Sequence, residues 1–223
     1  MIELAPVELE QVRRRWDDVT ARVAACRRPW MHDVAIVAVT KGFDQSAIAA
    51  AADVGASSIG ENYAQQILAK RDVIEALRPE VHFIGHLQSN KVRQLTGLVT
   101  VWASLDRRSV VDEVAKRAPA ARVRLQVNTT GEDQKAGVAP DELSGLLHRA
   151  RERGLEVEGL MTIGPTDAPP EAARPAFARL RALVDEHGLE VCSMGMTHDL
   201  EIGLEEGSTE VRVGTALFGP RPR

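Results

Sequence analysis

Short apolar runs alternate with longer segments of mixed composition along most of the chain. Each run is five to seven residues long, as is typical of buried strands. The intervening segments mix Ala, Leu and charged residues at helical spacing. The pattern therefore predicts eight strands, at residues 34–39, 56–60, 81–85, 99–104, 123–128, 157–163, 190–194 and 210–214.

The alternation of strands and helices favours parallel strand pairing through right-handed crossovers. Eight such units within 223 residues predict an α/β fold of the (β/α)8 TIM-barrel type. A doubly wound open sheet is the structural alternative that the pattern leaves open. No segment is long or polar enough to act as a linker, so we expect one domain over residues 1–223.

The opening segment predicts an extra N-terminal helix. Apolar residues recur at helical spacing from Pro6 to Cys26, and Arg27-Arg28-Pro29 is expected to end that helix. Because the chain ends nine residues after the eighth run, we expect no helix after the last strand. The N-terminal helix is then expected to complete the outer ring.

Two further segments have predicted structures. The PTDAPP loop at 165–170 is predicted to connect the sixth strand to its helix, and the Ala-rich tract 47–52 is predicted to be helical.

Composition and charge narrow the classes of function. The chain is 44% apolar and 27% charged, with a net charge of −4, which gives no support to binding of nucleic acid or of a membrane surface. No apolar run approaches the roughly 18 residues of a spanning helix, and the acidic N-terminus does not resemble a secretory signal. Cys26 and Cys192 are isolated and the histidines are scattered, so we expect a cytoplasmic protein without a metal site.

Lys41 is the first candidate for chemistry, because it follows the first predicted strand at the mouth of the barrel. Partial removal from water favours the neutral form of an amine, and a neutral amine can condense with an aldehyde. The alternative is a lysine that simply extends into solvent.

Polar residues also follow the second and third predicted strands. Glu61 and Asn62 are expected either to cap the next helix or to contact a ligand beside Lys41. The third run continues into the polar segment 82–91, in which His82 alternates with apolar residues and is expected to be a core histidine with satisfied hydrogen bonds.

The last two strands carry the strongest signal. The seventh leads into Ser193–Asp199, which combines hydroxyls, a glycine and a helix start, and the eighth leads into Gly214 and Thr215. Barrels of this type often bind phosphate between the loops after strands seven and eight. Arg212 alternates with two valines, so it faces the other side of the sheet and needs a partner there. That partner is either a ligand or a carboxylate of the barrel.

An amine, a phosphate cradle and a buried cation together indicate one ligand. It carries an aldehyde, a phosphate and an acceptor for Arg212, and pyridoxal 5′-phosphate (PLP) has all three.

Several motifs in order give the chain a family resemblance. They are AVTK (38–41), GENY (60–63), HFIGHLQSNK (82–91), SMGM (193–196) and GSTEVRVGTALFG (207–219). With these, residues 8–220 closely resemble the pyridoxal phosphate homeostasis protein family. The resemblance implies a barrel like the cofactor domain of bacterial alanine racemase.

The resemblance also implies a set of cofactor-binding residues. Lys41 would form an internal aldimine with PLP, Asn62 would lie against the cofactor, and Arg212 would face the pyridine nitrogen. The phosphate would be held by Ser193, Gly214 and Thr215, with help from Thr197, which stands where the family more often has Ser.

The resemblance and the chemistry of Arg212 together predict a binding protein rather than an enzyme. A cation cannot accept the proton of the pyridine nitrogen, so the ring is a poor electron sink. Related racemases add a catalytic tyrosine from a C-terminal domain, whereas this chain ends at Arg223 and its only tyrosine is Tyr63. We expect no catalytic residues.

The predicted role is to hold PLP on Lys41 and to take part in PLP and amino-acid homeostasis. We expect a monomer, with PLP-dependent apo-enzymes as recipients of the cofactor. One alternative is a PLP-dependent amino-acid racemase or lyase of low activity. Another is a phosphosugar barrel that uses Lys41 as an aldolase amine.

Overall fold

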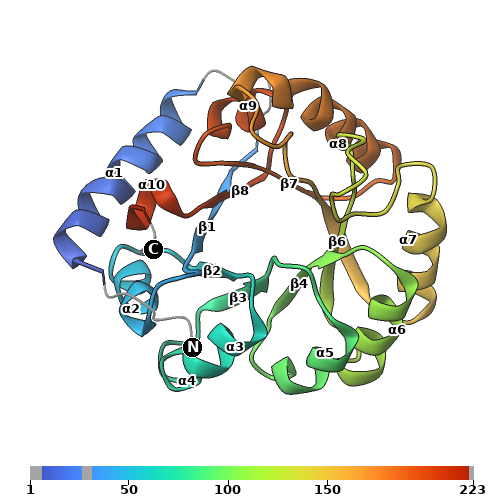
Figure 1. Cartoon of the computed structure of the whole chain (residues 1–223), viewed down its shortest axis with the longest axis horizontal. Coiled ribbons are helices and arrows are strands. Elements are labelled where there is room, and N and C mark those ends of the chain that lie inside the picture. Colours follow the sequence, from blue (N-terminus) through green and yellow to red (C-terminus); the bar gives the residue numbers. More distant parts are fainter. Residues whose placement is uncertain (1–6, 27–31, 221–223) are drawn as a thin grey trace.

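The eight predicted strands form a closed parallel barrel in the computed structural model, which describes residues 7–26 and 32–220 (Figure 1). Each strand pairs with its neighbour in the sequence, and β1 closes the ring by pairing with β8. This confirms the (β/α)8 fold and excludes the open sheet. The strands are β1 (Ala35–Val39), β2 (Ser58–Glu61), β3 (Glu80–Phe83), β4 (Val101–Leu105), β5 (Arg122–Gln126), β6 (Glu156–Met161), β7 (Val191–Met196) and β8 (Glu210–Val213).

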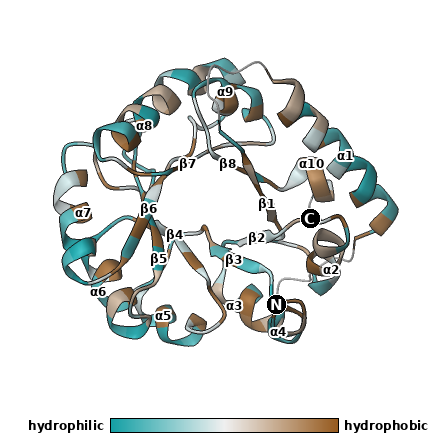
Figure 2. Cartoon of the chain, turned by 180° about the vertical axis from the view of Figure 1, so that it is seen from behind, coloured by the Kyte–Doolittle hydropathy of each residue, from teal (hydrophilic) through white to brown (hydrophobic). Residues whose placement is uncertain are grey.

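Helices surround the barrel and mix hydrophobic and hydrophilic residues along their length, as expected for helices with one face on the sheet (Figure 2). In the described part of the chain, no helix is long and apolar enough to cross a lipid bilayer. The helices are α1 (Leu9–Ala25), α2 (Gln45–Asp53), α3 (Ala64–Ala69), α4 (Arg71–Leu77), α5 (Ser89–Leu95), α6 (Arg108–Arg117), α7 (Leu143–Glu152), η1 (Pro170–Ala173), α8 (Arg174–Glu186), α9 (Leu200–Glu205) and α10 (Thr215–Phe218).

The N-terminal helix α1 completes the outer ring, as predicted. It buries Val12, Val19 and Val23 and lies against α2, α9 and α10 (Figure 1). Arg22 forms an ion pair of 2.7 Å with Glu201 of α9. The residues expected to end the helix, 27–29, lie outside the described ones.

One prediction about the outer ring was wrong, because the short helix α10 follows the last strand. Its four residues are too few to show helical periodicity in the sequence. The Ala-rich tract 47–52 is helical within α2, and the loop at 165–170 connects β6 to η1 and α8, as predicted.

The main hydrophobic core lies between the strands and the helices. A second, smaller cluster of Val39, Ile84, Val101 and Ala103 lies on the inner face of β1, β4 and the end of β3. Branched apolar residues usually fill the whole interior of such barrels. Here β5, β7 and β8 instead place polar side chains inside, so one half of the interior is apolar and the other half is ionic.

The residues of that ionic half are almost completely buried. The guanidinium groups of Arg124 and Arg212 and the carboxylate of Glu210 belong to side chains that are at most 4% exposed. His82 and Ser193 lie beside them and are also buried. Burial of charge is costly unless the charges are paired, so these side chains are expected to be closely connected.

Candidate functional site

A cavity of about 540 Å3 opens at the C-terminal ends of the strands. All but one of the seven residues predicted to bind a cofactor line it. The exception is Ser193. The six residues are Lys41, Asn62, Thr197, Arg212, Gly214 and Thr215.

Lys41 is half-buried in the turn that follows β1, and the residues on either side fix its position. Thr40 is fully buried; its carbonyl accepts a hydrogen bond of 2.9 Å from Lys70 Nζ, and its hydroxyl donates one of 2.6 Å to Glu61. Gly42 adopts a φ of 86°, a left-handed conformation that favours glycine, and its N–H donates to the Gln66 side chain at 2.9 Å. Hydrogen bonds at both neighbouring residues therefore fix the backbone that carries the amine.

Glu61 does not cap the next helix and does not line the cavity. Its carboxylate lies outside the barrel wall, completely buried, and forms an ion pair of 2.5 Å with Lys70. Burial raises the pKa of Glu61, and the charge of Lys70 opposes that shift. The pair therefore contacts Thr40, the residue before Lys41, and does not line the cavity.

Asn62 contributes an amide with unused hydrogen-bonding capacity. Its Oδ1 atom is buried and has no partner among the described residues. The backbone of Asn62 packs so closely on Gly85 that a Cβ atom at Gly85 would lie 2.1 Å from the Asn62 carbonyl oxygen. The glycine after β3 therefore allows Asn62 to take its place at the cavity.

The loops after β7 and β8 meet at Thr197. Its Oγ1 atom accepts a hydrogen bond of 3.2 Å from the N–H of Ala216, and its carbonyl lies 3.4 Å from Arg22 of α1. Gly214 and Thr215 line the same part of the cavity. Two hydroxyls and a glycine backbone therefore converge there, a combination suited to an anion.

Arg212 lies on the inner face of β8 and is 3% exposed. Its Nη1 atom donates to Ser193 Oγ at 2.6 Å and its Nη2 atom to the Thr162 carbonyl at 2.7 Å. Burial lowers the pKa of Arg212, and the carboxylates of Glu210 and Asp199 oppose that shift. The direct partners of Arg212 are thus a hydroxyl and a carbonyl, and Ser193 connects it to the barrel carboxylate of Glu210. Because Arg212 also lines the cavity, a ligand contact stays a prediction.

Ser193 does not lie where a phosphate ligand was predicted. Its side chain is completely buried within the barrel, where its hydroxyl is 2.6 Å from Glu210 Oε1. The residue points inward early in β7, whereas the cavity begins at Met196, the last residue of that strand. Thr197, expected to play a supporting part, is the hydroxyl of this loop that lines the cavity.

His82 is a core histidine, as expected from its alternation with apolar residues. It is 1% exposed, and its two ring nitrogens contact Glu80 at 2.6 Å and Arg124 at 2.9 Å.

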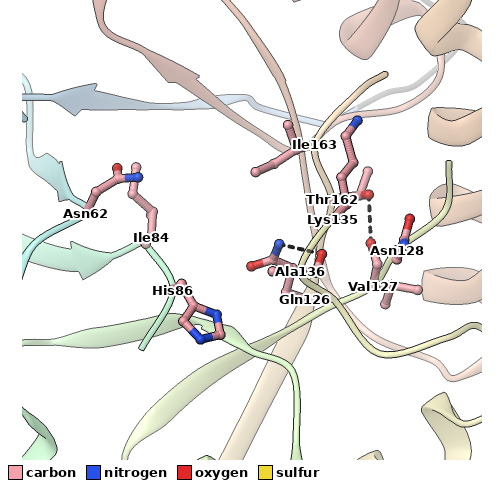
Figure 3. A pocket seen from close by; sticks show the side chains of 11 residues that line it. Asn62, Ile84, His86, Gln126, Val127, Asn128, Lys135, Ala136, Thr162 and Ile163 are labelled. Atoms are coloured by element: carbon pink, nitrogen blue, oxygen red, sulfur yellow. Dashed lines mark hydrogen bonds between the residues drawn. The ribbon is translucent and has the colours of Figure 1, made fainter. Parts of the chain in front are cut away.

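A smaller pocket of about 150 Å3 adjoins the main cavity and shares Asn62, Ile84 and Ile163 with it. Figure 3 shows Asn62 and His86 on one side and Gln126 and Lys135 on the other. Lys135 is already engaged, because its amine donates to the Gly164 carbonyl and forms an ion pair of 2.8 Å with Glu132. The pocket is thus a polar extension of the main cavity on the side of β3 and β5.

Sequence reasoning missed part of the cavity wall. The loop at 165–170 lines the cavity, as do Met196, His198 and Asp199. A signal was available, because this loop follows the sixth predicted strand and so had to lie at the same end of the barrel as Lys41.

The family model of the alanine racemase N-terminal domain matches residues 7–222 of the chain. Among curated proteins, the pyridoxal phosphate homeostasis protein of Aquifex aeolicus is 44% identical over 178 residues, which cover 75% of this chain and 78% of that protein. The protein of the same name from Pseudomonas aeruginosa is 40% identical over 195 residues, 84% of this chain and 85% of that one.

Solved structures agree with these relatives. PipY of Synechococcus elongatus PCC7942, in a structure with PLP bound, is 27% identical with a TM-score of 0.78, covering 93% of this chain and 100% of that one. Alanine racemase from Corynebacterium glutamicum is 18% identical with a TM-score of 0.73, covering 99% of this chain and 63% of that one, and shares the fold. The chain therefore belongs to the family of pyridoxal phosphate homeostasis proteins, which is built on the alanine racemase N-terminal domain.

Proposed function

We propose that the protein binds PLP in the cavity at the barrel mouth and takes part in the homeostasis of PLP and amino acids. The observation that carries this proposal is that Lys41, Arg212 and the hydroxyls of Thr197 and Thr215 line a single cavity. The names of the curated relatives and the PLP-bound structure of PipY support it.

The donors of the cavity fit the three functional parts of PLP. Thr197, Gly214 and Thr215 offer hydroxyl and backbone groups for the phosphate, and the guanidinium of Arg212 offers a donor for the ring nitrogen. Asn62 brings an amide oxygen that has no partner among the described residues. PLP would supply an aldehyde, and Lys41 is the amine of the cavity that would hold it.

Arg212 favours storage over turnover. A guanidinium donates hydrogen bonds and does not accept a proton, so it keeps the ring nitrogen unprotonated and the ring a weak electron sink. Tyr63, the only tyrosine of the chain, is 50% exposed and does not line the cavity. The curated relatives are also named as homeostasis proteins rather than as enzymes. We therefore assign Lys41 a binding role.

We further propose that the protein works in the cytoplasm as a monomer and transfers PLP to apo-enzymes. The described cysteines form no disulfide, and burial raises the pKa of the Cys192 thiol to about 12, which suits a structural cysteine in a reducing compartment. The cavity is reached from the open end of the barrel, which suits transfer of a bound cofactor.

The test is the absorption spectrum of the purified protein with added PLP. Wild type should develop a near-visible band, and borohydride reduction followed by peptide mapping should place the adduct on Lys41. Lys41→Ala should lose the adduct at this position and at least tenfold in affinity, while Lys116→Ala, an exposed lysine of α6, should behave as wild type.

Two outcomes would contradict the proposal. An adduct that stays equally strong in Lys41→Ala and maps to surface lysines would remove the assigned site. Conversion of single L-amino acids to D-isomers or keto acids at rates typical of enzymes, about 1 per second or faster, would favour the racemase or lyase.

A further inference from the structure

The face of Arg212 that turns away from the cavity rests on Ser193. A guanidinium can only donate, so the Ser193 oxygen must accept the bond of 2.6 Å from Nη1. The hydroxyl proton is then directed at Glu210 Oε1, which lies 2.6 Å away and can only accept when ionised. The direction of both hydrogen bonds is therefore fixed by chemistry.

Glu210 is the carboxylate nearest to this pair inside the barrel. It is 2% exposed and, besides its hydrogen bond with Ser193, forms an ion pair of 2.8 Å with Arg124 on β5. The carboxylate thus lies between two buried guanidinium groups, Arg124 and, through Ser193, Arg212. Without its charge the two cations would share a dry interior with less compensation.

We propose that Ser193 and Glu210 are positioning residues that hold the guanidinium of Arg212 charged and directed into the cofactor cavity. The inference rests on the proposed function and assigns Ser193 a role beneath Arg212 in place of one on the phosphate. Neither residue lines the cavity, so both act through Arg212.

Another carboxylate of the ionic half, Glu158, offers a matched control. Glu158 on β6 forms ion pairs with Arg122 and with Arg124, at 3.6 Å to the latter, and it has no contact with Arg212. Glu158→Gln removes one inward-facing charge, as Glu210→Gln does, but leaves the support of Arg212 in place.

The experiment compares PLP release and the near-visible spectrum of reconstituted variants. Ser193→Ala and Glu210→Gln should release PLP about tenfold faster than wild type, as expected for one hydrogen bond lost from a charged group. Their absorption maximum should shift in the same direction as that of Arg212→Gln. Ser193→Thr, which keeps the hydroxyl, and Glu158→Gln should stay within about twofold of wild type.

A combination of variants distinguishes positioning from a general structural role. In the Arg212→Gln background, Ser193→Ala should add less than twofold, because Ser193 acts through the missing guanidinium. Full additivity in that background, or equal effects of Ser193→Ala and Glu158→Gln, would overturn the inference. If Glu210→Gln does not fold, the comparison of Ser193→Ala with Ser193→Thr still decides. A wild type without a PLP band would instead refute the proposed function.

Discussion

At the scale of single residues, the position of Lys41 depends on groups that never meet the cavity. The carbonyl of Thr40 accepts a hydrogen bond from Lys70, and its hydroxyl donates one to Glu61. Lys70 and Glu61 form a buried ion pair with each other. The sequence showed Lys41 at a strand end, and that placement is confirmed at the mouth. It did not show Lys70 as a partner of Glu61, because Lys70 lies in the turn between α3 and α4 and its place in the sequence does not reveal which buried carboxylate it will meet.

The buried pair leads to a prediction about stability. Lys70→Met should lower the free energy of unfolding by about 3–5 kcal/mol, because Glu61 would remain as an uncompensated buried charge. Lys70→Met combined with Glu61→Gln should lose less than the sum of the single variants, by about 2 kcal/mol. Urea unfolding of the four proteins measures this coupling, and additive losses would show that the two side chains are energetically independent.

At the scale of elements, α1 closes the ring and also reaches the site. It packs against α2, α9 and α10, while Arg22 pairs with Glu201 and contacts the carbonyl of Thr197. The sequence predicted all eight strands because each is a short run in which apolar residues either continue or alternate with polar ones. It missed α10, whose single turn exists because the loops after β7 and β8 pack together and not because of its own periodicity.

Packing of α1 can be tested at one buried and one exposed position. Val19→Ala should lower the free energy of unfolding by about 1–3 kcal/mol, because Val19 is 1% exposed and its methyl groups pack on the barrel. Arg14→Ala on the solvent face should change it by less than about 0.5 kcal/mol. Thermal unfolding of both variants provides the comparison, and equal effects would show that α1 is not part of the cooperative unit.

At the scale of the whole molecule, the barrel contains two polar environments, the cavity at its mouth and the ionic half of its interior. The sequence did not distinguish them well. The mouth was predictable, since chemistry in such barrels lies at the C-terminal ends of strands, and six of the seven chosen residues line the cavity. The ionic half of the interior was not predictable. Strand alternation shows that a residue faces inward, but it does not show how far below the mouth of the barrel that residue lies. Ser193 was placed at the mouth for this reason, although it lies inside the barrel.

The opposite rim of the barrel gives a prediction about pH. Hydrogen bonds from His82 and Arg122 lower the pKa of Glu80 to about 2, so the folded state favours its carboxylate. The stability this provides is complete above the pKa of the unfolded chain, about 4.5, and is lost as the pH falls from there to about 2.

Between pH 5 and 2, the free energy of unfolding should therefore fall by about 1–2 kcal/mol less in Glu80→Gln than in wild type. This value is reduced for the partial exposure of the side chain. Urea titrations at several pH values measure the slope. An identical slope in wild type and variant would show that Glu80 is not a source of acid sensitivity.

The continuous ionic half of the barrel also constrains protein engineering. From Arg212 through Ser193, Glu210 and Arg124 to His82, each side chain hydrogen-bonds to the next, so a single exchange removes one partner of a neighbouring buried group. A designer who wishes to alter the electronic properties of a bound ring must therefore redesign these positions together, as one block. Libraries that vary them one at a time leave a neighbouring polar group without its partner, whereas concerted replacements can open the scaffold to new chemistry.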